Sequence, residues 1–144
     1  MKVLLDTSVL VAAMVEAHPH HGRALSWIQR AKRREVTAII ASHSLAELYA
    51  ILTSLPLRPR IPSATAWQLI QQNVLDTFTV VSLSDDDYRA VLKHLSTTGI
   101  VGGATYDALI AHAASKVQVD HLVTFNAQDF RRVYPDLSDR VIEP

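Results

Sequence analysis

Residues 1–13 read MKVLLDTSVLVAA, and this stretch decides the fold class. Lys2–Leu5 is predicted to be a short buried strand, and a carboxylate, Asp6, follows it directly. A helix is expected from about residue 8 to residue 16, because Thr7 and Ser8 can cap its start. A buried carboxylate is costly unless something pairs with it. Asp6 is therefore expected to cap the helix, to hold a cation, or to do both.

The rest of the chain repeats this alternation of strand and helix. Further strands are predicted at β-branched, apolar runs, at residues 36–42, 78–84 and 121–125, with a short fifth at 140–144. Apolar residues at helical spacing predict helices at 18–35, 42–55, 63–76, 85–99 and 104–118. Alternating strands and helices are typical of an α/β protein with a parallel sheet.

The composition limits the classes of protein. A length of 144 residues suits one domain spanning 1–144, and 49% hydrophobic with 19% charged residues is globular. The absence of cysteine excludes disulfides and thiolate zinc sites and is compatible with the cytoplasm. No apolar run is long enough for a membrane span or a signal peptide. Basic and acidic residues both number 14, so a polyanionic substrate would need a local basic patch or a bridging metal.

Several acidic and polar side chains are expected at one edge of the sheet. Ligands of open α/β sheets collect at the carboxyl ends of the strands, where Asp6 lies. The strand at 121–125 is followed by a second polar group, made up of Thr124, Asn126 and Asp129. Glu47 and Asp107 lie in helices beside apolar stripes, so they should face the core or its rim, where a lone charge is penalised.

Carboxylates that converge on one spot repel one another, and they stay ionised together only around a hard cation. Mg²⁺ or Mn²⁺ suits such oxygen ligands, and it can activate water and neutralise a phosphodiester. Each residue also has an ordinary structural interpretation. Asp6 or Asp107 can cap its helix, Glu47 can reach the surface, and residues 126–130 can be a capped turn entering a helix.

Four blocks in this order resemble the PIN domain family, and most of all its VapC toxin branch. They are LLDTSVL at 4–10, SLAELYAIL at 44–52, ATYDALIAHAA at 104–114 and LVTFNAQDF at 122–130. The segment AHPHHGRAL at 17–25 is also similar to that branch. The resemblance covers nearly the whole chain. It implies a three-layer α/β/α fold around a parallel sheet of four to five strands, and a Mg²⁺- or Mn²⁺-dependent endoribonuclease silenced by a cognate antitoxin.

Carried over residue by residue, the resemblance implies an acidic metal site. Its catalytic and metal-binding carboxylates are Asp6, Glu47 and Asp107. The fourth acidic position of the family aligns with Asn126, which can coordinate through its carbonyl oxygen but brings no charge. Asp129 is expected to compensate, directly or through water. Ser8 and Thr124 match small hydroxyl positions that the family places near the site. The resemblance also implies a homodimer, which we expect to have an apolar seam around Leu48, Leu52 and Trp67.

Other polar clusters have simpler interpretations. A soft-metal site at His18, His20 and His21 is conceivable, but a solvated helix cap is favoured. The basic run at 30–34 is expected to be a solvated face, with contact to an RNA backbone as the alternative. The acidic run at 84–88 is explained by helix capping. His112 lies five residues after Asp107, about 140° round a helix, and should face elsewhere.

The sequence fits four rival classes of protein less well. A phosphoacceptor receiver domain would need a second acidic residue beside Asp6, where Thr7 stands. A haloacid-dehalogenase-type phosphatase would need an aspartate at position 8, where Ser8 stands. A nucleotide-binding module would need a glycine-rich loop after the first strand. The serious rival is a PIN-like protein that binds RNA or a partner without cutting, which the Asn126 departure favours and the three intact carboxylates disfavour.

Overall fold

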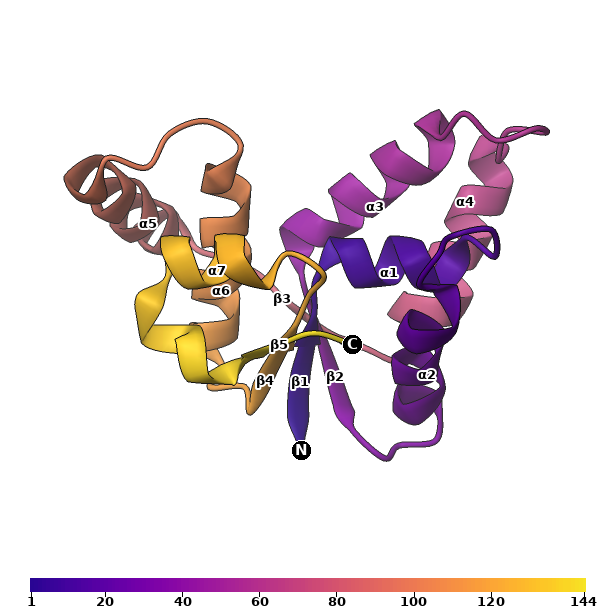
Figure 1. The fold of residues 1–144 in the computed structure, drawn as a ribbon, viewed down its shortest axis with the longest axis horizontal. Helices are drawn as coiled ribbons and strands as arrows, with labels where there is room; N and C mark the ends of the chain where they lie inside the picture. The colour runs from indigo at the N-terminus through magenta and orange to yellow at the C-terminus, as the bar shows by residue number, and fades with distance from the viewer.

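The computed structural model describes residues 1–144, folded around a parallel five-stranded sheet (Figure 1). The strands pair in the order β3-β2-β1-β4-β5. Their bounds are Lys2–Leu5 (β1), Thr37–Ala41 (β2), Thr79–Val81 (β3), His121–Val123 (β4) and Val141–Ile142 (β5). Leu4 of β1 lies opposite Ile39 of β2 on one side and Leu122 of β4 on the other. The predicted parallel sheet is confirmed, and β1 is its central strand.

Helices cover both faces of the sheet, which confirms the three-layer arrangement (Figure 1). One face carries α1 (Thr7–Met14), α2 (His21–Lys32), α3 (Ser42–Ser54) and α4 (Ser63–Ile70). The other face carries α5 (Asp85–Thr98), α6 (Ala104–Lys116) and α7 (Ala127–Val133). No helix combines the length and the apolar character that crossing a bilayer requires.

The central strand β1 is buried on both of its faces. Val3 and Leu5 pack with the cluster formed by α1 to α4, whereas Leu4 packs with the cluster formed by α6 and α7. Successive side chains of a strand point to opposite faces, so a strand between two helical layers needs apolar residues at every position. The carboxylate of Asp6 appears at the point where this apolar run leaves the sheet.

The structure differs from the sequence prediction in three places. The helix expected at 63–76 is α-helical only to Ile70 and continues as a π-helical turn, Gln71–Leu75. Helix α7 begins within residues 126–130, where entry into a helix was only one interpretation, and a 3₁₀ helix at Pro135–Arg140 was not expected. Leu48 and Leu52 are fully buried inside this chain, where they pack in the α1–α4 cluster. They are therefore not free to form a dimer seam, and that expectation was wrong for these two residues.

Four helices begin at the carboxyl edge of the sheet. Asp6 is the N-cap residue of α1, while α3, α6 and α7 begin without any side-chain hydrogen bond to cap them. The first N–H groups of a helix carry a partial positive charge and favour nearby anions. This edge is therefore suited to carboxylates and to phosphate groups.

Candidate active site

Asp6 is the most deeply buried acidic residue of this edge, with 3% of its surface exposed. Its Oδ1 accepts a hydrogen bond from the backbone N–H of Thr7 at 2.7 Å, and its Oδ2 accepts from the hydroxyls of Ser8 and Thr124, both at 2.8 Å. Burial raises the pKa of Asp6, and these hydrogen bonds act against that rise. An ionised carboxylate has about four acceptor positions, so one remains on Oδ1 for a further partner.

The hydroxyls of Ser8 and Thr124 are held in a fixed direction. The Ser8 hydroxyl accepts from the backbone N–H of Phe125 at 3.2 Å, and that of Thr124 accepts from the backbone N–H of Asn126 at 2.9 Å. Because each oxygen already accepts from an N–H, its own proton is directed at Asp6. The two supporting hydroxyls predicted from the sequence thus do lie beside Asp6, and they tie β1 to the segment that follows β4.

Glu47 reaches the same edge from α3. Its Oε1 accepts a hydrogen bond from the hydroxyl of Thr7 at 3.3 Å, and Nε2 of His43 lies 3.3 Å away, one helical turn earlier. Burial raises the pKa of Glu47, the nearby His43 lowers it, and the charge of Asp6 raises it again. Glu47 and Asp6 are therefore linked through a single residue, Thr7.

Asp107 lies in the first turn of α6, within electrostatic range of the other acidic residues. Burial raises its pKa to about 6, and the charges of Asp6, Asp129 and Glu47 contribute to that rise. The guanidinium of Arg132 on α7 acts in the opposite direction. Four carboxylates from α1, α3, α6 and α7 thus share one electrostatic environment.

The substituted fourth position lies at the start of α7. Asn126 is the N-cap residue of this helix, and its exposed side chain makes no capping hydrogen bond. Asp129, one turn further on, is also exposed, and its charge raises the pKa of Asp107. Asp129 therefore brings negative charge to the site that Asn126 does not.

The donor set suits a hard divalent cation, since its members are carboxylate, hydroxyl and amide oxygens. As the side chains stand, no three His, Cys, Asp or Glu residues form a group tight enough to ligate one ion. Mg²⁺ keeps several of its waters and binds proteins through one or two carboxylates. Such an ion fits this edge, where Asp6 offers one free acceptor position and where burial, together with like charges, raises the pKa of Asp107.

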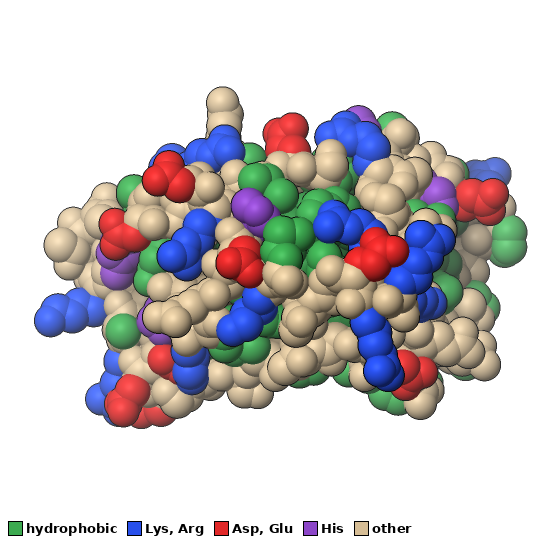
Figure 2. Space-filling view, turned by 90° about the horizontal axis from the view of Figure 1, so that it is seen from below, with side chains coloured by type: hydrophobic (Ala, Val, Ile, Leu, Met, Phe, Trp, Pro, Cys, Tyr) green, Lys and Arg blue, Asp and Glu red, His purple; other side chains and the backbone are tan.

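The basic run at residues 30–34 lies at the opposite edge of the sheet, beside the amino ends of β2 and β3. Arg30 and Arg33 each lie 3.8 Å from Glu35, and Lys32 donates to Asn73 at 2.7 Å. Figure 2 looks onto this side of the molecule, where Lys and Arg side chains are interspersed with Asp and Glu. This placement fits a solvated face that Glu35 neutralises in part. It does not put the run beside the acidic edge.

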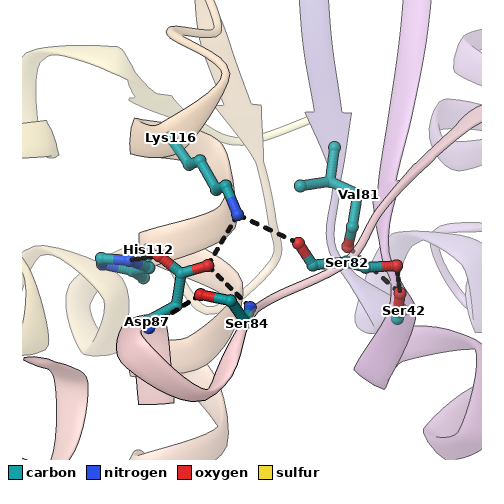
Figure 3. Close-up of polar contacts among 7 residues, drawn as sticks. All are labelled: Ser42, Val81, Ser82, Ser84, Asp87, His112 and Lys116. Atoms are coloured by element: carbon teal, nitrogen blue, oxygen red, sulfur yellow. Dashed lines mark hydrogen bonds and ion pairs between the residues drawn. The ribbon is translucent and has the colours of Figure 1, made fainter. Parts of the chain in front are cut away.

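The acidic run at residues 84–88 is a helix start, as predicted. Ser84 and Asp87 form a reciprocal capping box at the N-terminus of α5. Asp87 also accepts from Nζ of Lys116 at 2.6 Å and lies 3.1 Å from Nε2 of His112 (Figure 3). His112 therefore faces α5 and not the acidic edge. The network ties α5 to α6.

The histidine segment between α1 and α2 packs on an aromatic ring. The rings of His18 and His20 stack on Phe125 at centroid distances of 6.2 and 5.0 Å, and the guanidinium of Arg23 lies 5.7 Å from the same ring. His20 is the N-cap residue of α2 but makes no side-chain capping bond. The segment therefore packs against the ring of Phe125, whose backbone N–H donates to the hydroxyl of Ser8.

Sequence reasoning missed three contributors to this edge. Thr7 joins Asp6 to Glu47, and Arg132 is the basic group that lowers the pKa of Asp107. His43 precedes Glu47 by four residues, which is the spacing of neighbours on one helix face. That spacing was the only signal available. No local pattern indicates that α7 brings Arg132 to Asp107.

Together, the parallel sheet and the carboxylates clustered at its carboxyl edge define an α/β protein with an acidic, oxygen-donor site. The profile described as PIN domain matches residues 3–135. The chain is also similar to two ribonucleases of Mycobacterium tuberculosis. It is 33% identical to Ribonuclease VapC27 over 112 residues, 78% of this chain and 76% of the relative. It is 35% identical to Ribonuclease VapC40 over 109 residues, 76% of this chain and 75% of the relative. The chain belongs to the PIN domain family.

Solved structures share the fold of this chain. The crystal structure of Mycobacterium tuberculosis VapC20, a sarcin-ricin loop cleaving toxin, superposes with a TM-score of 0.68 at 16% identity, covering 88% of this chain and 92% of that one. VapBC2 of Rickettsia felis, bound to a DNA fragment from its promoter, has a TM-score of 0.64 at 22% identity, covering 100% and 98%. At these identities the likeness concerns the fold.

Proposed function

We propose that this chain is an endoribonuclease that hydrolyses RNA phosphodiesters, and that it is the toxin of a VapBC-type toxin–antitoxin pair. The single observation that carries the proposal is the shared environment of Asp6, Glu47, Asp107 and Asp129. Membership of the PIN family and relatives named as ribonucleases support it. We further propose that residues 1–144 act as one domain, in the cytoplasm, where a ribonuclease meets cellular RNA.

The site residues have distinct proposed roles. Asp6, Glu47 and Asp107 hold Mg²⁺ or Mn²⁺, and Asn126 and Asp129 contribute from the start of α7. A bound divalent ion would supply a nucleophilic water and charge neutralisation at the phosphodiester. Ser8 and Thr124 orient Asp6 and favour its ionised form by donating to Oδ2. The uncapped N-termini of α3, α6 and α7 and the guanidinium of Arg132 offer positive charge to the RNA backbone.

The experiment is to sequence RNA 5′-ends after brief induction of the protein, together with a cleavage assay on purified RNA. New 5′-phosphate ends are expected in the wild type, and none in Asp107→Asn. In vitro cleavage should need added Mg²⁺ or Mn²⁺ and should stop with a chelator. Metal binding without any cleavage would instead support the rival function, a PIN-like protein that binds RNA or a partner without cutting.

The exposed aromatic residues of α3 and α4 are candidate contacts for a protein partner. Trp67 on α4 is 52% exposed and Tyr49 on α3 is 41% exposed, although both helices pack tightly in the core. We propose that this face serves a homodimer or the cognate antitoxin. The structures similar to this chain include VapBC2 of Rickettsia felis and FitAcB of Neisseria gonorrhoeae, the latter with a TM-score of 0.65. Light scattering that shows only monomer at tens of micromolar would count against the homodimer.

A further inference from the structure

Two aromatic rings from different helices stack at the rim of the acidic edge. The ring of His43 on α3 and the ring of Tyr106 on α6 lie 4.8 Å apart between centroids, with only 6° between their planes. Each belongs to an element that carries a site carboxylate. His43 precedes Glu47 by one helical turn, and Tyr106 directly precedes Asp107. The stack therefore bridges the two helices that bring Glu47 and Asp107 to the site.

In this stack the ring of His43 is the more shielded from solvent, and the ring of Tyr106 is the more exposed. Nε2 of His43 is buried and lies 3.3 Å from Oε1 of Glu47, without meeting the geometry of a hydrogen bond. Tyr106, in contrast, is 50% exposed. Other exposed tyrosines, Tyr49 and Tyr88, stack on no second ring. A planar aromatic group arriving from solvent can therefore extend this stack beyond Tyr106.

We infer that Tyr106, supported by His43, is a stacking platform for an unpaired nucleobase of the RNA next to the phosphodiester that is cut. This inference rests on the proposed ribonuclease function. Sequence-specific proteins recognise RNA mainly in single strands and loops, whose unstacked bases lie on aromatic side chains. A ring already fixed by a parallel neighbour loses little freedom when a base stacks on it. Because Tyr106 adjoins Asp107, the stacked base would belong to a nucleotide at or beside the reacting phosphate.

The binding test uses a series of unstructured single-stranded 12-mer RNAs, each carrying one 2-aminopurine, whose fluorescence is quenched by stacking. Binding is measured with Mg²⁺ in an Asp6→Asn background, so that the RNA stays intact. The Asp6→Asn protein should quench the probe at one or two positions. Adding Tyr106→Phe should preserve the quenching. Adding Tyr106→Leu should abolish it and weaken RNA binding about 5- to 100-fold, the usual effect of losing one stacked base.

The matched control is Tyr88→Leu, which removes an equally available tyrosine from α5, away from the acidic edge. It should leave binding and quenching unchanged. In the active protein, cleavage of a randomised RNA pool should show a changed base preference beside the cut for Tyr106→Leu but not for Tyr106→Phe. On one defined RNA, Tyr106→Leu should raise KM with a smaller effect on kcat, as expected for a binding contact.

Equal quenching and equal affinity in the Tyr106→Leu and Tyr88→Leu proteins would overturn the platform. Loss of antitoxin binding by Tyr106→Leu with unchanged RNA binding would overturn it too, and would assign the ring to a protein partner. The two proposals fail separately. A wild-type protein that cleaves no RNA removes the proposed function, whereas a wild type that cleaves while Tyr106→Leu behaves as its control removes only the platform.

Discussion

The hydroxyl of Thr124 donates a 2.8 Å hydrogen bond to Oδ2 of Asp6, although 118 residues separate them in the chain. The same hydroxyl accepts from the backbone N–H of Asn126. Thr124 is fully buried, so bulk water cannot replace either of these two hydrogen bonds. The hydroxyl oxygen of Thr124 therefore contributes both to the ionised form of Asp6 and to the start of α7.

The first prediction concerns the hydroxyl oxygen of Thr124. Thr124→Val keeps the side-chain volume but leaves the Asn126 N–H unpaired and removes a donor from Asp6, which should cost about 1–3 kcal/mol of stability. The pKa of Asp6 should rise further, and metal affinity and cleavage should fall about 10- to 100-fold, as for other residues that orient a metal ligand. Thr124→Ser keeps the hydroxyl and should behave nearly as wild type. Thermal melts and calorimetric metal titrations measure both effects, and equal metal affinity in the two variants would contradict the role.

The second prediction concerns the repulsion among the carboxylates. Asp107→Asn should fold and lose RNA cleavage, and without metal it should melt about 2–4 °C higher, a shift of about 1 kcal/mol for a partly exposed group. The pKa of Asp107 is raised to about 6, so the folded state binds a proton more tightly than the unfolded state. Metal-free stability should therefore fall as pH rises from about 4 through 6, and less so in the variant. Asp139→Asn on the exposed 3₁₀ helix is the control. Wild-type cleavage by Asp107→Asn would refute the site.

The third prediction tests the substituted fourth position. Asn126→Asp should tighten metal binding and raise cleavage at limiting Mg²⁺, because the affinity for hard cations follows ligand charge. If Asp129 compensates, Asp129→Ala should lower metal affinity more in the parent protein than in Asn126→Asp. The double-mutant cycle would then show a nonzero coupling. Calorimetric metal titration of all four proteins measures the coupling. Additive effects with unchanged affinity would mean that position 126 faces away and that Asp129 only supports its helix.

The fourth prediction concerns acid stability, away from the acidic edge. The ammonium of Lys116, the Ser84 backbone N–H and His112 hold the pKa of Asp87 well below its usual range. A lowered pKa stabilises the folded state above the unfolded value of 3.8, and this contribution is lost as pH falls further. Asp87→Asn should therefore lower the melting temperature from neutral pH down to about 5, and the gap to wild type should narrow below about 4. Melts at a series of pH values measure it, with Asp86→Asn, an exposed neighbour in the same turn, as the control. A difference in melting temperature between Asp87→Asn and wild type that stays constant down to pH 3 would exclude the lowered pKa of Asp87 as its cause.

Features encoded by local sequence patterns could be predicted from the sequence, whereas features that depend on contacts between distant segments could not. The apolar run before Asp6 and the periodic helices are local patterns, and they located every strand and most helices to within a few residues. The grouping of Glu47 and Asp107 with Asp6 came from the resemblance of four separated blocks, because local periodicity does not say which helices meet. For the same reason, the stack of His43 on Tyr106 was not foreseen. The full burial of Leu48 inside its own chain was also missed, since an apolar stripe looks alike whether it packs within one chain or between two.

The strand order has a consequence in time. β1 contributes Asp6, whereas its neighbour β4 and Thr124, which donates to Asp6 from 118 positions further along the chain, are synthesised later. Until then, Asp6 has only its local donors, and α7 does not exist to bring charge to Asp107. A growing chain therefore cannot complete the acidic edge before β4 and α7 have been synthesised. For a protein proposed to cut RNA, the site therefore stays incomplete throughout the synthesis of residues 1–123.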